Sequence, residues 1–182
     1  MGKGAVFLDR DGVIVEEYGY VKAIDDMPIY PFTQDSIKKI HDAGMLAIVI
    51  TNQSGVARGI FSEDKVKEKN RLLDEETCVD AVYYCPHHPE GIIKKYQKKC
   101  DCRKPEIGLI RNACSDFDIE LTKSFFIGDR ETDIQTGKNA GIKTILVRTG
   151  YGAQEEKKDI HPDYICDSLI EAVDLILKEM ER

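Results

Sequence analysis

A long hydrophobic run is absent from this chain of 182 residues. The longest purely apolar stretch extends only from Met45 to Ile50, whereas a helix needs about 20 apolar residues to cross a bilayer. Met1 to Gly4 lead directly into a strand-like segment and not into the apolar region of a secretory signal. We therefore expect a cytoplasmic protein without membrane contacts.

An excess of positive charge is also absent. The chain has 26 Lys and Arg residues against 33 Asp and Glu residues, which gives a net charge of −7. Binding to nucleic acid needs clustered cations, so we expect no nucleic-acid partner. A local group of cations, by default a solvated face, can still attract a phosphorylated ligand, and the sequence holds such a group in Lys94, Lys95, Lys98, Lys99, Arg103 and Lys104.

Internal repeats, low-complexity segments and long linkers are missing as well, so we expect residues 1–182 to form a single domain around one core. A nucleotide P-loop is missing too, because no Gly-Lys-Ser/Thr follows Gly55 or Gly59. ATP is therefore not implied.

Apolar strand-like runs alternate with amphipathic helical patterns along the chain. Strands are expected at 5–8, 46–50, 81–84, 125–127, 144–147 and, more weakly, 164–165, and helices near 34–43, 62–75, 107–117, 134–140 and 168–178. Ser62 is expected to cap the second helix, Pro105 to begin the third and Gly141 to end the fourth. This order predicts an α/β fold with a doubly wound, mostly parallel sheet.

Two acids follow the first expected strand. Asp9 and Asp11 stand one residue apart after the apolar run from Val6 to Leu8, and Gly12 comes next. Asp and Gly also form simple turns, which is the alternative interpretation. Ligands of open α/β sheets bind at the carboxyl ends of the strands, so the acid pair favours a site for Mg²⁺ and phosphate.

Three further polar motifs lie at expected strand ends or before a helix. They are Thr51-Asn52-Gln53-Ser54-Gly55, Arg103-Lys104-Pro105 and Gly128-Asp129-Arg130-Glu131-Thr132-Asp133. Together with the acid pair they resemble the four motifs of the haloacid dehalogenase-like (HAD) phosphatases, and the resemblance spans nearly the whole chain. That family usually carries a cap domain, but only short insertions are present here, so we expect a minimal or absent cap and an open site.

The chemistry of the acids agrees with the roles that the resemblance implies. Asp9 is expected to attack phosphorus and become an aspartyl-phosphate, while Asp11 serves as general acid and then as general base. Thr51 and Lys104 are expected to support the phosphoryl group as further catalytic residues. Mg²⁺ is expected to be held by Asp9, Asp11 (through its backbone carbonyl) and Asp129, with Asp133 orienting Lys104 or metal-bound water.

A second group of residues has the composition of a zinc site. Cysteines and histidines occur close together in Cys85-Pro86-His87-His88-Pro89 and Cys100-Asp101-Cys102. In a cytosolic chain this pattern indicates tetrahedral Zn²⁺ and not disulfides. We expect a structural zinc held by Cys85, His87, Cys100 and Cys102, with His88 as the rival ligand. Ordinary buried cysteines are the alternative, which is the interpretation that we adopt for Cys78, Cys114 and Cys166.

The zinc pattern and the first two motifs narrow the resemblance to the heptose bisphosphate phosphatases within the HAD family, to which the histidinol-phosphatases are related. The resemblance implies a Mg²⁺-dependent phosphatase that removes the C7 phosphate of a heptose 1,7-bisphosphate during nucleotide-activated heptose synthesis, and we expect it to act as a monomer. It implies substrate contacts from Arg10, Glu17, Tyr18, Gly19, Tyr20, Asn52, Gln53, Ser54, Arg103 and Arg130. Arg103 could hold the distal phosphate through its bidentate fork.

Two alternatives stay open at this point. A histidinol-phosphatase would share the motifs, although the long segment from Glu90 to Lys99 favours the heptose enzymes. A zinc-stabilised binding module that has lost catalysis would belong to another class, and the intact acid pair, Lys104 and Asp129 weigh against it. A nucleic-acid zinc module is a more distant possibility.

Overall fold

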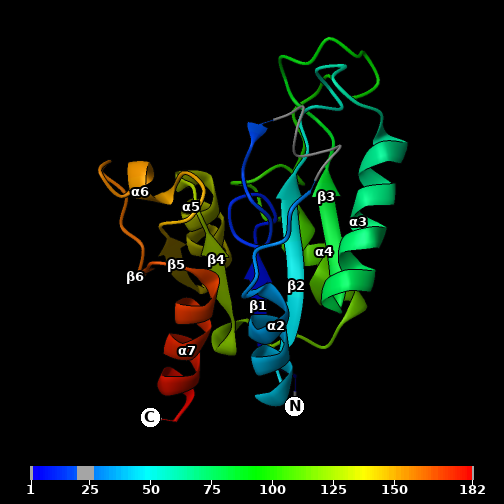
Figure 1. Cartoon of the computed structure of the whole chain (residues 1–182). Coiled ribbons are helices and arrows are strands. Elements are labelled where there is room, and N and C mark those ends of the chain that lie inside the picture. The colour runs from blue at the N-terminus through cyan, green and yellow to red at the C-terminus, as the bar shows by residue number, and fades with distance from the viewer. Residues whose placement is uncertain (1, 20–26, 182) are drawn as a thin grey trace.

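The computed structural model describes residues 2–19 and 27–181 of the chain (Figure 1). Tyr20, one of the expected substrate contacts, lies outside the described residues.

Six strands form one parallel sheet in the order β3-β2-β1-β4-β5-β6. Their bounds are β1 (Ala5–Leu8), β2 (Leu46–Asn52), β3 (Ala81–Cys85), β4 (Phe125–Gly128), β5 (Lys143–Val147) and β6 (Tyr164–Cys166). The reversal of order at β1 and β4 makes the sheet doubly wound, so the predicted α/β fold class is confirmed.

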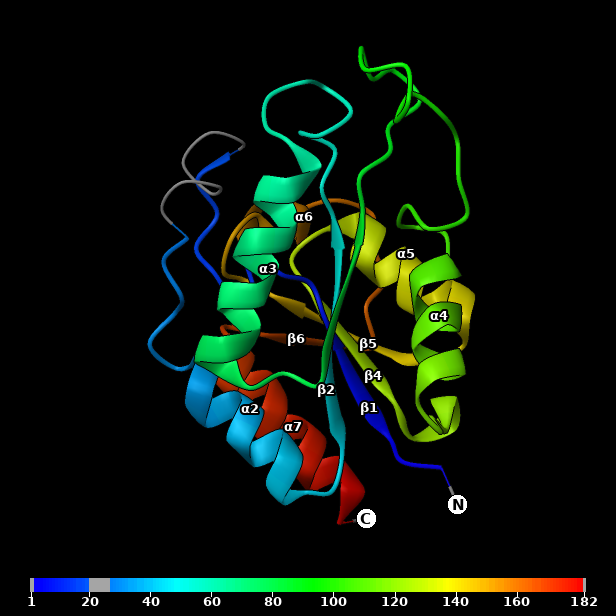
Figure 2. The same cartoon turned by 90° about the vertical axis from the view of Figure 1, so that its right-hand side faces the viewer.

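Helices cover both faces of the sheet (Figure 2). Three helices lie on one face: α2 (Thr33–Asp42), α3 (Glu63–Thr77) and α7 (Leu169–Met180). Two lie on the other face: α4 (Gly108–Asp116) and α5 (Glu131–Ala140). Two short elements, a 3₁₀ turn (Leu121–Lys123) and α6 (Gly152–Glu155), were not expected from the sequence. The β3–α4 connection is a long excursion above the sheet (Figure 1).

The first strand shows why a short apolar run can organise the core. Val6 and Leu8 pack with the cluster under α2 and α7, while Ala5 and Phe7 pack with the cluster under α4. Successive side chains of a strand point to opposite faces, so a central parallel strand must be apolar at every position.

The register of the sheet brings the polar motifs together. Leu8 pairs with Val49 on one side and with Ile127 on the other, and the backbone N–H of Asp9 donates to the carbonyl of Ile127 at 3.0 Å. Parallel strands end at the same edge, so Asp9, Thr51 and Asp129 emerge side by side.

The helix boundaries confirm two of the three sequence predictions. The hydroxyl of Ser62 accepts a hydrogen bond from the backbone N–H of Lys65 and caps α3, and Gly141 ends α5 with φ of 71°. Pro105 does not begin α4, so that prediction is wrong. The N–H of Glu106 instead donates to the carbonyl of Arg103 in a turn, and the helix starts only at Gly108.

The six cysteines of the chain carry no disulfide, and three of them lie apart from the expected zinc ligands. Cys166 is buried as expected, and Cys114 is partly buried. Cys78 is exposed, contrary to expectation, because it lies just beyond α3 and ends that helix in the left-handed conformation at φ of 56°. None of the helices in the described part of the chain combines the length and apolarity that a bilayer crossing requires.

Replacing Ser62 by alanine is expected to lower the free energy of unfolding by about 1 kcal/mol, because the N-terminal amides of α3 lose their cap. The measurement is urea unfolding followed by circular dichroism. Ser115→Ala is the matched control, since the hydroxyl of Ser115 only donates to a carbonyl within α4. Equal stability of the two variants would contradict the capping role.

Candidate active site

A cavity of 490 Å³ opens at the carboxyl ends of the central strands. It is lined by Asp9, Arg10, Asp11, Glu17, Gly19, Thr51, Asn52, Gln53, Ser54, Phe61, Arg103, Lys104, Arg130, Glu131, Thr132, Asp133, Tyr151, Glu155 and Lys158. Among the described residues, every substrate contact predicted from the sequence lines this cavity except Tyr18, which is exposed and lies outside it.

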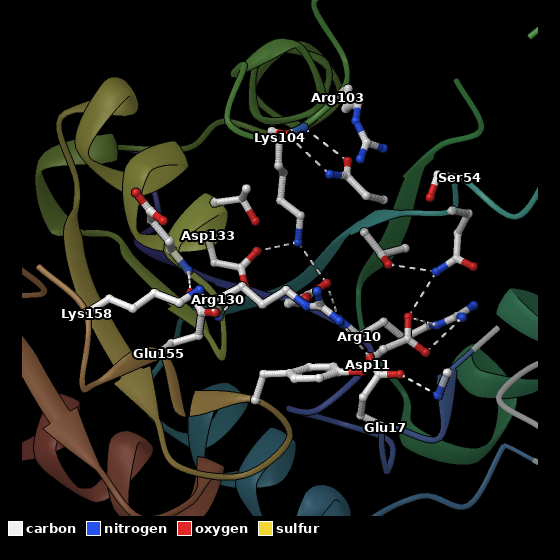
Figure 3. A pocket seen from close by; sticks show the side chains of 18 of the residues that line it. Arg10, Asp11, Glu17, Ser54, Arg103, Lys104, Arg130, Asp133, Glu155 and Lys158 are labelled. Atoms are coloured by element: carbon white, nitrogen blue, oxygen red, sulfur yellow. Dashed lines mark hydrogen bonds and ion pairs between the residues drawn. The ribbon is translucent and has the colours of Figure 1, made fainter. Parts of the chain in front are cut away.

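Lys104 bridges two carboxylates at the bottom of this cavity (Figure 3). Its Nζ lies 2.8 Å from Oδ1 of Asp9 and 2.6 Å from Oδ1 of Asp133. All three side chains are buried. Asp133 accepts two further hydrogen bonds at Oδ2, from the backbone N–H groups of Asp129 and Arg130. The start of α5 thus fixes Asp133, and Asp133 fixes the lysine.

The charges of this group act strongly on one another because water is excluded. Burial raises the pKa of Asp9 to about 7, with the Asp133 carboxylate adding to the rise and Lys104 opposing it. Burial acts to lower the pKa of Lys104, but Asp133 and Asp9 outweigh it and raise that pKa to about 12. Lys104 is therefore a permanent cation beside Asp9.

Asp129 is completely buried between two glycines. Its Oδ2 accepts a hydrogen bond from the backbone N–H of Tyr151 at 2.8 Å. A Cβ added at Gly12 would lie 2.3 Å from this oxygen, and one at Gly150 would lie 2.2 Å from it. Both glycines have positive φ, 85° and 58°. The chain can therefore close around Asp129 only with glycine at these positions.

One oxygen of Asp129 is available for a cation. Its Oδ1 is buried and has no hydrogen-bond partner among the described residues, and one oxygen from each of Asp9, Asp129 and Asp133 lies within 4.8 Å of the others. Burial, with Asp133 and Asp9 nearby, raises the pKa of Asp129 to about 8. A hard divalent cation would relieve this crowding and satisfy the orphaned oxygen, so the residues fit Mg²⁺.

Asp11 faces the cavity but does not join the three clustered carboxylates. The Nε and NH2 of Arg10 donate to its two oxygens at 3.2 and 3.0 Å, and Nε2 of Gln53 donates to Oδ2 at 3.0 Å (Figure 3). Its side chain keeps 16% exposure. The carboxylate is thus held firmly in place beside Asp9 while still open to a ligand.

Three predicted substrate contacts have their polar groups engaged within the protein. The guanidinium of Arg10 is bound to Asp11 and to Asn70. Gln53 donates to Asp11 and to the hydroxyl of Thr51. Asn52 exchanges two hydrogen bonds with the backbone of Lys104, at 3.0 and 3.2 Å. Their geometry is that of positioning residues, a role that the sequence prediction did not include.

Two other cations are placed as expected for ligand contacts. The guanidinium of Arg130 lies 4.0 Å from the centre of the Tyr151 ring and 3.4 Å from Oε2 of Glu17. Arg103 donates to the backbone carbonyl of His87 at 3.3 Å. Both line the cavity, which therefore offers cationic groups at its rim as well as at its floor.

Sequence reasoning missed the contribution of the segment after β5. Tyr151 stacks on Arg130, and Glu155 and Lys158 form an ion pair at the cavity wall. The signal that could have found them is the Arg148-Thr149-Gly150-Tyr151 sequence, which follows a strand end at the same edge of the sheet. Asn70, in the middle of α3, carries no such signal.

The four expected zinc ligands come together at one point. The Sγ atoms of Cys85, Cys100 and Cys102 lie 3.1 to 3.5 Å apart, and Nδ1 of His87 lies 3.6 Å from Cys85 and 3.3 Å from Cys102. A tetrahedron around zinc, with bonds of about 2.3 Å to sulfur, has edges slightly longer than this. The hydrogen bond between Cys102 and Cys85, with those to Cys100 and His87, lowers the pKa of the Cys102 thiol to about 5, which favours the thiolate that binds metal.

His88 is directed away from the sulfur cluster. Its Nε2 lies 3.2 Å from NH2 of Arg58, and its Nδ1 accepts from the backbone N–H of Glu90. Both ring nitrogens are thus engaged elsewhere, which separates the two histidines that the sequence left as rivals.

The segment from Glu90 to Lys99 is ordered by more than the cysteine cluster. The backbone N–H groups of Ile92 and Ile93 donate to the carbonyl of Ala57 at 2.8 and 3.0 Å. The hydroxyl of Tyr96 donates to Glu63 at the start of α3. The sequence did not indicate these contacts, because they depend on which segments the fold places side by side.

Comparison with known proteins agrees with this architecture. A family model described as "HAD-hyrolase-like" matches residues 101–172. The D-glycero-beta-D-manno-heptose-1,7-bisphosphate 7-phosphatase of Haemophilus ducreyi is 43% identical over 95% of this chain and 98% of its own length. The protein of that name from Escherichia coli K12 is 35% identical over 97% and 95%. A crystal structure of the D,D-heptose 1,7-bisphosphate phosphatase from B. bronchiseptica, complexed with magnesium and phosphate, has a TM-score of 0.82 at 29% identity and covers 97% of this chain and 99% of that one.

The doubly wound sheet and the aspartate-lysine site at its edge define a hydrolase of the HAD-like class, as the relatives are. At this level of identity over nearly its whole length, the chain belongs to the family of D-glycero-beta-D-manno-heptose-1,7-bisphosphate 7-phosphatases. It is a phosphatase, as the HAD-like resemblance of its sequence predicted.

Replacing Gly150 by alanine is expected to weaken Mg²⁺ binding by about 10–100-fold, because the new Cβ displaces the buried Asp129 carboxylate and disturbing the surroundings of a metal ligand has effects of this size. The measurement is titration calorimetry with MgCl₂. Gly141→Ala is the matched control: Gly141 also has positive φ, 71°, but a Cβ there meets nothing within 4 Å. That variant should lose stability and keep its Mg²⁺ affinity, and equal affinities in both variants would refute the packing argument.

Proposed function

We propose that this protein removes the C7 phosphate of D-glycero-D-manno-heptose 1,7-bisphosphate through an aspartyl-phosphate on Asp9, in the synthesis of nucleotide-activated heptose. The observation that carries the proposal is the buried Asp9–Lys104 pair beneath a cavity whose rim presents Arg103 and Arg130. The names of the relatives supply the sugar, and the beta configuration in those names favours that anomer.

In the first step, an oxygen of Asp9 attacks phosphorus and the bond between phosphorus and the C7 oxygen breaks. The departing alkoxide takes a proton from the carboxylic acid of Asp11, which faces the cavity beside Asp9. Lys104 already lies 2.8 Å from Asp9 and offsets the negative charge of the transferring group. The hydroxyl of Thr51, at the end of β2, supports the same group.

In the second step, the Asp11 carboxylate takes a proton from a water molecule. The water oxygen bonds to phosphorus, the bond between phosphorus and Asp9 breaks, and inorganic phosphate leaves with Asp9 restored. The site is then ready for another turnover, with Asp11 protonated as at the start. One residue can fill both roles because the two steps approach phosphorus from the same side of the cavity.

Mg²⁺ would be held by Asp9, Asp129 and the backbone carbonyl of Asp11, with Asp133 as a further oxygen close by. When bound, it supplies positive charge that orients the phosphate and offsets the charge of the clustered carboxylates. Lys104 alone does not balance the charges of Asp9, Asp129 and Asp133. Burial, with the nearby Asp133 carboxylate adding to its effect, raises the pKa of Asp9 and of Asp129. The excess negative charge of these buried side chains therefore supports a divalent cation.

The distal C1 phosphate is assigned to Arg103 and Arg130. A guanidinium presents a planar fork that matches phosphate oxygens. Arg130 is pre-oriented by its stacking on Tyr151, and Arg103 by its hydrogen bond to His87. Glu17, Gly19 and Ser54 line the remaining wall and are assigned to the sugar hydroxyls.

We expect kcat/KM for the heptose bisphosphate to exceed that for the 7-monophosphate by about 10²-fold, because hydrogen bonds to charged groups contribute roughly 1.5–3 kcal/mol each. The measurement is steady-state phosphate release from both anomers of the bisphosphate, from the monophosphate and from histidinol phosphate.

Two variants test the residues assigned to this reaction. Arg103→Met should reduce the preference for the bisphosphate. Asp9→Asn, with its fold intact by circular dichroism, should show no turnover. A preference for histidinol phosphate would replace the proposed substrate. Activity in the Asp9 variant would overturn the mechanism.

We further propose that the cluster of Cys85, His87, Cys100 and Cys102 holds a structural Zn²⁺. Four protein ligands leave no open position for catalysis. Cys102 directly precedes Arg103 and Lys104, so a metal at the cluster would fix the backbone that carries both cations into the cavity. The complete set of proposed catalytic residues lies within one chain, which agrees with action as a monomer on a phosphorylated sugar.

Replacing Cys100 by serine is expected to abolish stoichiometric zinc and to lower Tm by about 10 °C or more, because several kcal/mol of metal-binding free energy are lost. Metal content is measured by plasma mass spectrometry and Tm by calorimetry. His88→Gln is the matched control and should retain zinc. Zinc loss in the His88 variant, or wild-type protein without zinc, would contradict the assignment.

A further inference from the structure

A buried arginine, Arg10, lies beside the carboxylates of the active site and takes no part in the two chemical steps proposed for Asp9 and Asp11. Arg10 is only 1% exposed and is the largest of the fully buried side chains. Its position between Asp9 and Asp11 in the sequence suggests a ligand contact, but the guanidinium is buried and already donates to side chains of the protein.

Each of the three guanidinium nitrogens of Arg10 has a partner. Nε and NH2 donate to the two oxygens of Asp11, at 3.2 and 3.0 Å, and NH1 donates to Oδ1 of Asn70 at 3.0 Å. A two-pronged contact of this kind fixes the plane of a carboxylate as well as its distance. The fork thereby sets both side-chain torsions of Asp11.

Asn70 anchors this arrangement from a different part of the fold. It lies in the middle of α3, is 7% exposed, and its Nδ2 has no partner among the described residues. A buried asparagine with one unsatisfied group is costly in a helix, so packing alone does not favour it. Its acceptor oxygen is the group that holds the third nitrogen of Arg10.

We propose that Arg10 and Asn70 are positioning residues that hold Asp11 in the orientation needed for proton transfer. Asn70 fixes the guanidinium, the guanidinium fixes the Asp11 carboxylate, and Gln53 supports it from β2 at 3.0 Å. The inference rests on the proposed function, because it assigns Asp11 the proton transfers of both steps. It replaces the expectation that Arg10 contacts substrate.

The two steps depend on Asp11 in different ways, and this gives a test that a purely structural role would not pass. A sugar alkoxide must receive a proton from Asp11 as it leaves, whereas 4-nitrophenolate leaves without one. In the second step, water must lose a proton to Asp11 whichever group has left. With 4-nitrophenyl phosphate, a misplaced Asp11 therefore slows only the hydrolysis of the Asp9 phosphate.

The experiment compares Arg10→Lys, Asn70→Leu and Asn70→Asp with the wild-type protein in rapid-quench kinetics. Arg10→Lys keeps the charge but loses the fork, and Asn70→Leu removes the acceptor of NH1. Both should lower kcat for the sugar bisphosphate by about 10²-fold, as a misplaced catalytic group does, with little change in KM. With 4-nitrophenyl phosphate both should release a burst of 4-nitrophenolate and accumulate phosphorylated chain, seen by mass spectrometry of the intact protein.

Asn70→Asp retains an acceptor oxygen for Arg10 and should restore the kinetics of the wild type. Ser62→Ala, which weakens the same helix without touching Arg10, should lower stability and show no burst. If Arg10→Lys does not fold, the two Asn70 variants decide the matter. Equal losses with both substrates and no burst would overturn the positioning role. Absence of turnover by the wild-type protein with both substrates would instead overturn the proposed function.

Discussion

The buried ion bridge from Asp9 through Lys104 to Asp133 is the interaction on which the rest of the site depends. Its members come from the end of β1, from the connection before α4 and from the first turn of α5, and they meet at 2.8 and 2.6 Å. Removing one partner from a buried pair leaves an unpaired charge and typically costs about 3–5 kcal/mol. The bridge therefore joins three distant segments while it also places a cation beside the group assigned as nucleophile.

Most of the polar groups around this bridge serve to hold it. Asn52 forms hydrogen bonds with the backbone of Lys104, and backbone N–H groups at the start of α5 donate to Asp133. Gly12 and Gly150 pack closely against Asp129. Such supporting contacts explain why so many buried polar residues gather at one edge of an otherwise apolar sheet. A buried polar group is tolerated when it is fully paired. The unpartnered oxygen of Asp129, unlike the unpartnered Nδ2 of Asn70, lies among carboxylates where a cation fits.

The connection that carries the cysteine cluster leads directly into the active site. The connection between β3 and α4 has few apolar residues of its own, and it is tied down at Cys85 and Cys102, by the contacts to Ala57, and by Tyr96 against Glu63. Arg103 and Lys104 directly follow Cys102. Contacts that fix the backbone of this connection therefore also fix the two cations that line the active site. A long surface loop thus acquires the precision that helices and strands usually provide.

The strands, the fold class and the residues that gather at the carboxyl edge of the sheet could be predicted from the sequence alone, because apolar periodicity is local and parallel strands end on one side. The spacing of the cysteines and histidines also predicted the zinc-type ligands, with His88 left as the rival of His87. Only the tertiary structure separated His87 from His88, turned Arg10, Asn52 and Gln53 inward toward Asp11 and Lys104, and brought Asn70 and Tyr151 to the site. Those outcomes depend on contacts between segments far apart in the chain, and such contacts are set by how the helices pack on the sheet and not by any residue's neighbours in sequence.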